Sequence, residues 1–169
     1  VIDNSTDVLC YGESNGNITV NVAFGTSPYS YLWNNGQVTA NASNLVSGFY
    51  QVTITDASNC TITSSSLINE PPEIITSFTQ TNASCFGVCD GSISVVVNGG
   101  VLPYNYNWNP LQSNNPDVSG LCAGLYDVKI TDDNGCLVPI IMTITEPASI
   151  NANISMTESY CSDFNGTST

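Results

Sequence analysis

The chain reads PYSYLW at residues 28–33 and PYNYNW at residues 103–108, so the same pattern of proline, tyrosine and tryptophan returns 75 positions later. The agreement extends outward in both directions. Upstream, Cys10 returns as Cys85, and the alternating Ile18, Val20 and Val22 return as Ile93, Val95 and Val97. Downstream, after one inserted residue, VTITD at 52–56 returns as VKITD at 128–132, and Cys60 returns as Cys136. Self-similarity at a fixed period is the signature of tandem modules.

This repeat predicts the domain organisation. We expect a first module in residues 1–71, a second in residues 72–147, and the beginning of a third in residues 148–169. Apolar and polar residues alternate along short segments such as 18–22 and 50–54, which is the period of half-buried strands. No segment of ten residues has helical periodicity. About seven short strands per module favour an all-β fold, in which immunoglobulin-like β-sandwiches form a linear, disulfide-stabilised array.

Four aromatic residues are predicted to form the cores. Trp33 and Trp108 each lie on a strand opened by Pro-Tyr, and Tyr50 and Tyr126 lie on alternating strands. A sandwich this small needs large buried side chains, which favours packing over a sugar-stacking role for these aromatics.

The charge balance excludes several classes of function. The chain has 14 acidic residues and one basic residue, Lys129, with a net charge of −13. Such a charge repels nucleic acid and anionic membrane surfaces, and no apolar run is long enough to insert into a membrane. Histidine and arginine are absent, so no Ser-His-Asp or Cys-His arrangement can form. A pair of carboxylates could still hydrolyse a glycoside, but nothing in the spacing of the acidic residues points to such a pair. The sequence therefore predicts a non-enzymatic protein whose only candidate cofactor is calcium.

The seven cysteines favour an oxidising, extracellular setting. The simplest pairing is within each module, Cys10 with Cys60 and Cys85 with Cys136. Cys89 and Cys122 occur only in the second module, where the first has Ser14 and Val46, so we expect them to pair with each other. Cys161 is left unpaired within the chain, and its partner is expected in the remainder of the third module. A zinc site is disfavoured because only Cys85 and Cys89 are close in sequence and no histidine is present.

These motifs resemble a known repeat. The residues concerned are Cys10-Tyr11-Gly12, Asn15-Gly16, the PYSYLW stretch, Ser47-Gly48, Ile54-Thr55-Asp56, Cys60 and Glu70-Pro71. Together they resemble the SprB repeat of Bacteroidetes cell-surface adhesins, which include a gliding-motility adhesin. The resemblance implies a large secreted, repetitive surface protein exported by type 9 secretion, with no catalytic residues in the repeat. One departure is Asn59, which stands where the second module has Gly135.

The joins between modules are short. Residues 68–74 contain no glycine-serine linker, and Pro71 and Pro72 stiffen the passage. Acidic residues at the joins and in nearby turns are either solvated or bind calcium, since oxygen ligands suit hard cations. The calcium candidates are Glu70, Glu73, Glu146, Asp56 and Asp132.

Two functions follow from this pattern. The first is a structural stalk or filament repeat at the cell surface, whose partners are further copies of the module in the same chain, with lateral pairing of edge strands into fibres and contact with surface polysaccharide or other cells. The alternative is a carbohydrate- or ligand-binding module of an adhesin or secreted hydrolase. Candidate stacking residues for that alternative are Tyr11, Phe49 and Tyr160.

Overall fold

The computed structural model describes residues 2–155, which contain twelve strands and no helix. Module 1 comprises β1 (Ile2–Thr6), β2 (Gly16–Val20), β3 (Ser30–Trp33), β4 (Asn41–Leu45), β5 (Gly48–Thr55) and β6 (Thr61–Ile68). Module 2 comprises β7 (Ile75–Thr81), β8 (Gly91–Asn98), β9 (Asn105–Asn109), β10 (Asp117–Leu121), β11 (Gly124–Thr131) and β12 (Leu137–Ile144). Nothing in the described part could cross a membrane as a helix.

Each module is a sandwich of two three-stranded antiparallel sheets. The strand orders are β1-β2-β4 and β3-β5-β6 in module 1, and β7-β8-β10 and β9-β11-β12 in module 2. These orders correspond to strands A-B-E and C-F-G of the immunoglobulin fold, so the predicted fold class is confirmed. The count of about seven strands is wrong, because each module has six. The segment at residues 34–40, where the seventh strand would lie, is turn and irregular backbone.

The alternating residues of both sheets face inward and form one core per module. The four aromatic residues expected there are buried, and Trp33 and Trp108 are each only 2% exposed. Each indole Nε1 donates a hydrogen bond to a backbone carbonyl, that of Thr39 or Asn115, at 2.9 and 2.8 Å. Burial of these large rings is therefore achieved without leaving a polar group unpaired.

Tyr50 and Tyr126 add a second feature of immunoglobulin-like domains. Each lies near the start of the strand that corresponds to strand F, and its hydroxyl donates to a carbonyl four residues upstream, that of Val46 or Cys122, at 3.0 Å. This is the tyrosine corner. The same bond in both modules shows that the duplication extends to individual contacts.

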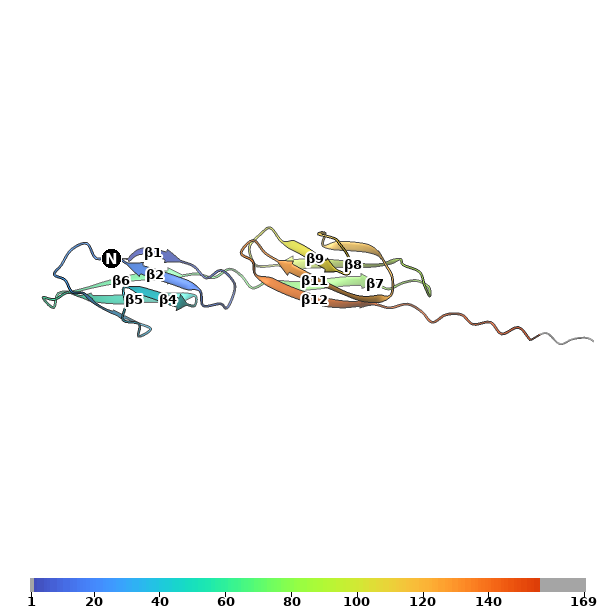
Figure 1. The fold of residues 1–169 in the computed structure, drawn as a ribbon, viewed down its shortest axis with the longest axis horizontal. Helices are drawn as coiled ribbons and strands as arrows, with labels where there is room; N and C mark the ends of the chain where they lie inside the picture. Colours follow the sequence, from blue (N-terminus) through green and yellow to red (C-terminus); the bar gives the residue numbers. More distant parts are fainter. Residues whose placement is uncertain (1, 156–169) are drawn as a thin grey trace, which may run out of the picture.

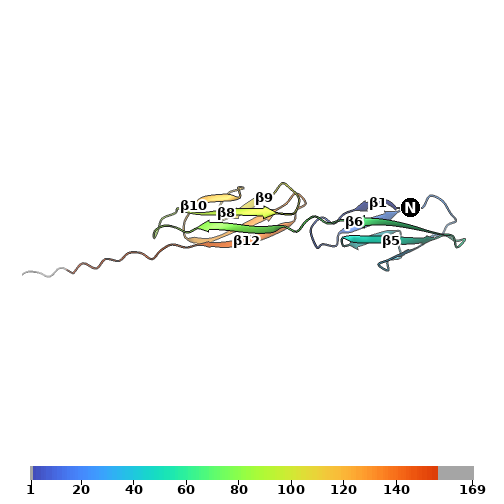
Figure 2. The ribbon, with the colours of Figure 1, turned by 180° about the vertical axis from the view of Figure 1, so that it is seen from behind.

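The two sandwiches lie end to end, and the chain passes from one to the other through a short extended linker (Figures 1 and 2). Each module therefore has two distinct ends. We call the end with the turn before the last strand (56–60 or 132–136) the leading end, and the end with the loop after the first strand (7–15 or 82–90) the trailing end. The trailing end of module 1 meets the leading end of module 2.

Candidate functional site at the module junction

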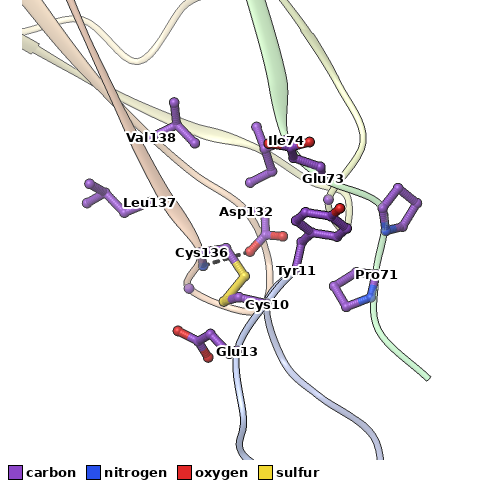
Figure 3. A pocket seen from close by; sticks show the side chains of 13 residues that line it. Cys10, Tyr11, Glu13, Pro71, Glu73, Ile74, Asp132, Cys136, Leu137 and Val138 are labelled. Carbon is purple, nitrogen blue, oxygen red and sulfur yellow. Dashed lines mark hydrogen bonds between the residues drawn. A yellow bond between two sulfur atoms is a disulfide. The ribbon is translucent and has the colours of Figure 1, made fainter. Parts of the chain in front are cut away.

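A disulfide joins the two modules. Cys10, in the trailing loop of module 1, is bonded to Cys136, in the leading turn of module 2, with the two Cα atoms 5.6 Å apart (Figure 3). The predicted pairs Cys10–Cys60 and Cys85–Cys136 are therefore wrong. Cys60 and Cys85 are free and exposed.

The length of a strand explains this correction. Cys60 immediately precedes β6, whereas Cys10 lies near the residues that follow β6, because the Gly12 amide donates to Glu70 Oε2 at 2.8 Å. The eight residues of β6 span roughly 26 Å at about 3.3 Å per residue, whereas a disulfide needs Cα atoms within about 7 Å. The early and late cysteines of one module thus lie at opposite ends of it.

Module 2 has the same arrangement and one additional bridge. The Gly87 amide donates to Glu146 Oε2 at 2.7 Å, which places the loop of Cys85 at the far end of β12 from Cys136. Cys89 is bonded to Cys122, the pair expected from the sequence, and this bridge lies within the trailing end. Cys161 lies outside the described residues.

The linker is clamped by two glycines of module 2. The Gly100 amide donates to the Pro72 carbonyl at 2.8 Å. A Cβ on Gly99 would lie 1.8 Å from the Glu73 carbonyl oxygen, and one on Gly100 would lie 2.7 Å from the Ile74 side chain. Both glycines also have positive φ, +84° and +61°, a region that side chains other than glycine disfavour. No other residue type would allow the linker to pass this close.

A groove of about 470 Å³ lies at the junction. Module 1 contributes Tyr11 and Glu13, the linker contributes residues 71–74, and module 2 contributes Asp132 and residues 135–138. The Tyr11 side chain points into the groove beside the linker in Figure 3. Beside the groove, Asn134 Nδ2 donates to the Leu9 carbonyl at 2.7 Å, a hydrogen bond between the modules.

The acidic residues of the turns cap backbone amides. Asp132 is 5% exposed, with Oδ1 accepting from the Cys136 amide and Oδ2 from the Val101 amide, both at 2.9 Å. Asp56 caps the amide of Cys60 in the same way, at 2.9 Å. The Thr26 amide is the main cause that lowers the pKa of Asp56 below its ordinary value of 3.8, followed by the Cys60 amide.

The acidic residues at the joins have individual structural contacts and do not share one site. Glu70 and Glu146 each hold a trailing loop, and the Gly12 amide lowers the pKa of Glu70, with a smaller contribution from the Ser47 hydroxyl. Glu73 lines the groove. Within residues 2–155, no three acidic or cysteine side chains come together as a metal site. Of the five calcium candidates, four hold turns and loops in place, and Glu73 shares the junction groove with Asp132.

Comparison with known proteins adds a family. The model of the SprB repeat matches residues 2–38 and 77–113. Both modules therefore match the SprB repeat, each over its first half. Each match runs from the first strand of a module to just beyond the strand that carries the tryptophan. No significant match to a curated protein was found.

Two solved structures have a distant likeness to the chain. An amphioxus IgVJ-C2 molecule has 12% identity and a TM-score of 0.36, with coverage of 76% of this chain and 94% of that one. Murine CEACAM1b has 12% identity and a TM-score of 0.35, with coverage of 80% and 94%. At such scores the fold assignment depends on the strand topology described above.

Sequence reasoning located the join between the modules but missed its disulfide and its groove, although one signal was available. The glycine pair at 99–100 directly follows β8 and marks a close backbone approach. The departure at Asn59 has a structural explanation, since it adopts a φ of 62° where Gly135 adopts 86°, and asparagine tolerates this region. Of the stacking candidates, Tyr11 lines the junction groove, Phe49 is exposed on β5, and Tyr160 lies outside the described residues.

Proposed function

We propose that these two modules form a stalk segment of a large secreted cell-surface protein, extending adhesive or motility regions away from the cell. The observation that supports this most is the Cys10–Cys136 bond across the join. A joint fixed by a covalent bond and by a linker clamped on glycines keeps neighbouring modules in line. Stiff, extended arrays suit a spacer better than a catalyst.

The position of the bridge also fits a load-bearing role. Force applied to the two ends of the chain passes through the Cys10–Cys136 bond, so the 126-residue segment between these positions is inside a closed loop and carries little tension. Only the segments before Cys10 and after Cys136 can then lengthen. A pull can therefore strip β1 from module 1 or β12 from module 2, while the rest of both modules stays inside the closed loop.

Family and chemistry support the location and partners in this proposal. SprB repeats are associated with bacterial cell surfaces, and two disulfides are stable outside the reducing cytoplasm. Export by type 9 secretion and a Bacteroidetes source follow from the resemblance. The partners would be further repeats in the same chain, with lateral contacts through the edge strands β6 and β12.

Single-molecule force spectroscopy tests this proposal. Unfolding a module of roughly 75 residues releases about 27 nm of chain at about 3.6 Å per residue. The oxidised protein, pulled from residues 1 and 169, should show no step of that length, and the protein treated with reductant should show two. Two full-length steps in the oxidised protein would rule out the load path.

A binding function remains a second candidate, because the groove at the junction has the aromatic Tyr11 beside the carboxylates of Glu73 and Asp132. An aromatic ring with polar neighbours is a common way to hold a sugar. A glycan array probed with the two-module chain separates the two functions. The stalk proposal predicts no reproducible binding. Binding that Tyr11→Ala abolishes would establish the alternative instead.

A further inference from the structure

The junction is made of two halves, and each half occurs once more at an outer end of the pair. The leading end of module 1 has Cys60 at the position of Cys136, and the trailing end of module 2 has Cys85 at the position of Cys10. Both outer cysteines are free and exposed. Outer ends with the geometry of the bonded halves would be able to form the same bond.

The leading end of module 1 holds Cys60 in the way that module 2 holds Cys136. The Asp56 amide donates to the Cys60 carbonyl at 3.0 Å, and the Asp132 amide donates to the Cys136 carbonyl at 3.1 Å. In both turns the cysteine amide donates to the aspartate Oδ1 at 2.9 Å. The two turns therefore present their thiol positions alike.

The trailing end of module 2 likewise repeats the loop of Cys10. The carbonyl of Cys85 accepts from the amide three residues later at 3.2 Å, and that of Cys10 does so at 3.1 Å. Glu146 holds the loop of Cys85 as Glu70 holds the loop of Cys10. Phe86 is 60% exposed where module 1 has Tyr11 at 54%, so an apolar ring is available at the same place.

A small groove at the leading end of module 1 completes the correspondence. It measures about 210 Å³ and is lined by Gly25, Ile54, Cys60 and Ile62, among others. In module 2 the equivalent glycine, Gly100, is contacted by Ile74 of the linker. The residue that follows module 2 at the position of Ile74 is Ile150, which is 97% exposed. One end of the pair thus carries an apolar residue, and the other carries an apolar groove.

One residue differs between the two leading ends. Phe24 stands where module 2 has Gly99, and its side chain is 90% exposed at the edge of the groove. An incoming segment therefore packs against the Phe24 ring rather than crossing the bare backbone. This change alters the contact without blocking Cys60, which lies on the turn after β5.

We propose that the disulfide seen at the junction recurs between all neighbouring copies of the repeat. Cys60 and Cys85 each form one such bond, with a cysteine of a neighbouring copy. Cys85 bonds to the leading-end cysteine of the next copy, and Cys60 bonds to the trailing-loop cysteine of the preceding copy. This deepens the stalk proposal and rests on it. In forming each bond, two thiols lose two protons and two electrons to a disulfide oxidant, which is reduced to two thiols.

Two copies of this chain provide the test, because the Cys85 end of one fits the Cys60 end of another. The chain is prepared with Cys161→Ser, and Cys60→Ser and Cys85→Ser are each added to separate samples. Oxidised glutathione is the oxidant. We expect the mixture of the two samples to form Cys60–Cys85 dimers at least about tenfold faster than either sample alone, with the linkage identified by mass spectrometry of non-reduced peptides.

Two further variants report on the groove. Ile150→Asp should slow the mixed dimerisation several-fold. Ile141→Asp should leave it unchanged, because Ile141 is 68% exposed on the middle of β12 and lies at neither end. Equal rates in the mixture and in the separate samples would overturn the inference, and so would a mixture whose thiols react with a small alkylating reagent but do not pair. Either result would leave the force-spectroscopy test of the stalk proposal unaffected.

Discussion

Comparison of Cys10→Ser with Cys60→Ser separates a bridge between modules from a bridge within one. In the structure, Cys10 is bonded across a 126-residue separation, and all of the two modules except β1 and β12 lies inside the closed loop. The chain-entropy model predicts that such a bond raises the unfolding free energy by up to about 5 kcal/mol. Measured values are often lower, so about 2 kcal/mol is taken as the minimum effect. Cys60 has an exposed thiol without a bond, so its replacement should change the unfolding free energy by no more than about 0.5 kcal/mol.

These energies correspond to different melting temperatures. The melting temperature of a domain of this size shifts by about 4–8 °C for each kcal/mol of unfolding free energy. Cys10→Ser should therefore lower the melting temperature by at least about 8 °C, and Cys60→Ser should lower it by less than about 4 °C. Differential scanning calorimetry of the monomeric protein without reductant measures both. Cys136→Ser is the matched control and should behave as Cys10→Ser does. Equal losses for Cys10→Ser and Cys60→Ser would refute the reasoning, because they would place both residues in one bond.

Three further predictions concern the turns, the clamp and the core. The pKa of Glu70 is held below its ordinary value of 4.5, so the stability that this carboxylate contributes is complete above pH 4.5 and is lost as the pH falls through the lowered pKa. Glu70→Gln should therefore flatten the pH dependence of the free energy of urea unfolding in that range, and an unchanged pH dependence would contradict this. Gly99→Ala should lower the unfolding free energy by clearly more than about 1 kcal/mol, because its Cβ would overlap the Glu73 carbonyl. The control Gly36→Ala, at φ +87° with open space around it, should lower the unfolding free energy by only about 1 kcal/mol, and equal losses of stability in a thermal melt would argue against the clamp. Tyr50→Phe should lower the unfolding free energy by about 1 kcal/mol through loss of its hydroxyl bond, and denaturant unfolding that matches the wild type would refute that role.

The strands and their cores were largely predictable from local pattern. Alternation in residues 18–22 and 50–54 reflects one buried face, and Trp33 and Trp108 could be placed inside because a small sandwich needs large side chains. The repeat fixed which residues are equivalent. Equivalence alone does not say which neighbours touch, so the cysteine pairing was not determined by it.

The direction of the strands would have settled the pairing. In a linear array the first and last strands of a module both run from its entry end to its exit end. Cys10 follows the first strand and so lies at the exit, while Cys60 precedes the last strand and so lies at the entry. The sequence spacing of Cys10 and Cys60 is compatible with a disulfide within one module. That spacing does not indicate at which end of the module each cysteine lies, so it favoured the wrong pairing.

The roles of the acidic residues were harder to foresee. Asp132 is buried against two backbone amides, and Glu70 reaches a loop 58 positions away in sequence. Such contacts depend on where the turns meet in space, which composition cannot convey. A high count of carboxylates therefore suggested calcium where the structure uses the same groups as caps.

Disulfide mapping tests the central claim most directly. The monomeric protein is alkylated without reduction, digested, and analysed by mass spectrometry. The structure predicts linked peptides containing Cys10 with Cys136 and Cys89 with Cys122, together with alkylated Cys60 and Cys85. Linked peptides containing Cys10 with Cys60 and Cys85 with Cys136 would contradict the covalent junction between the modules.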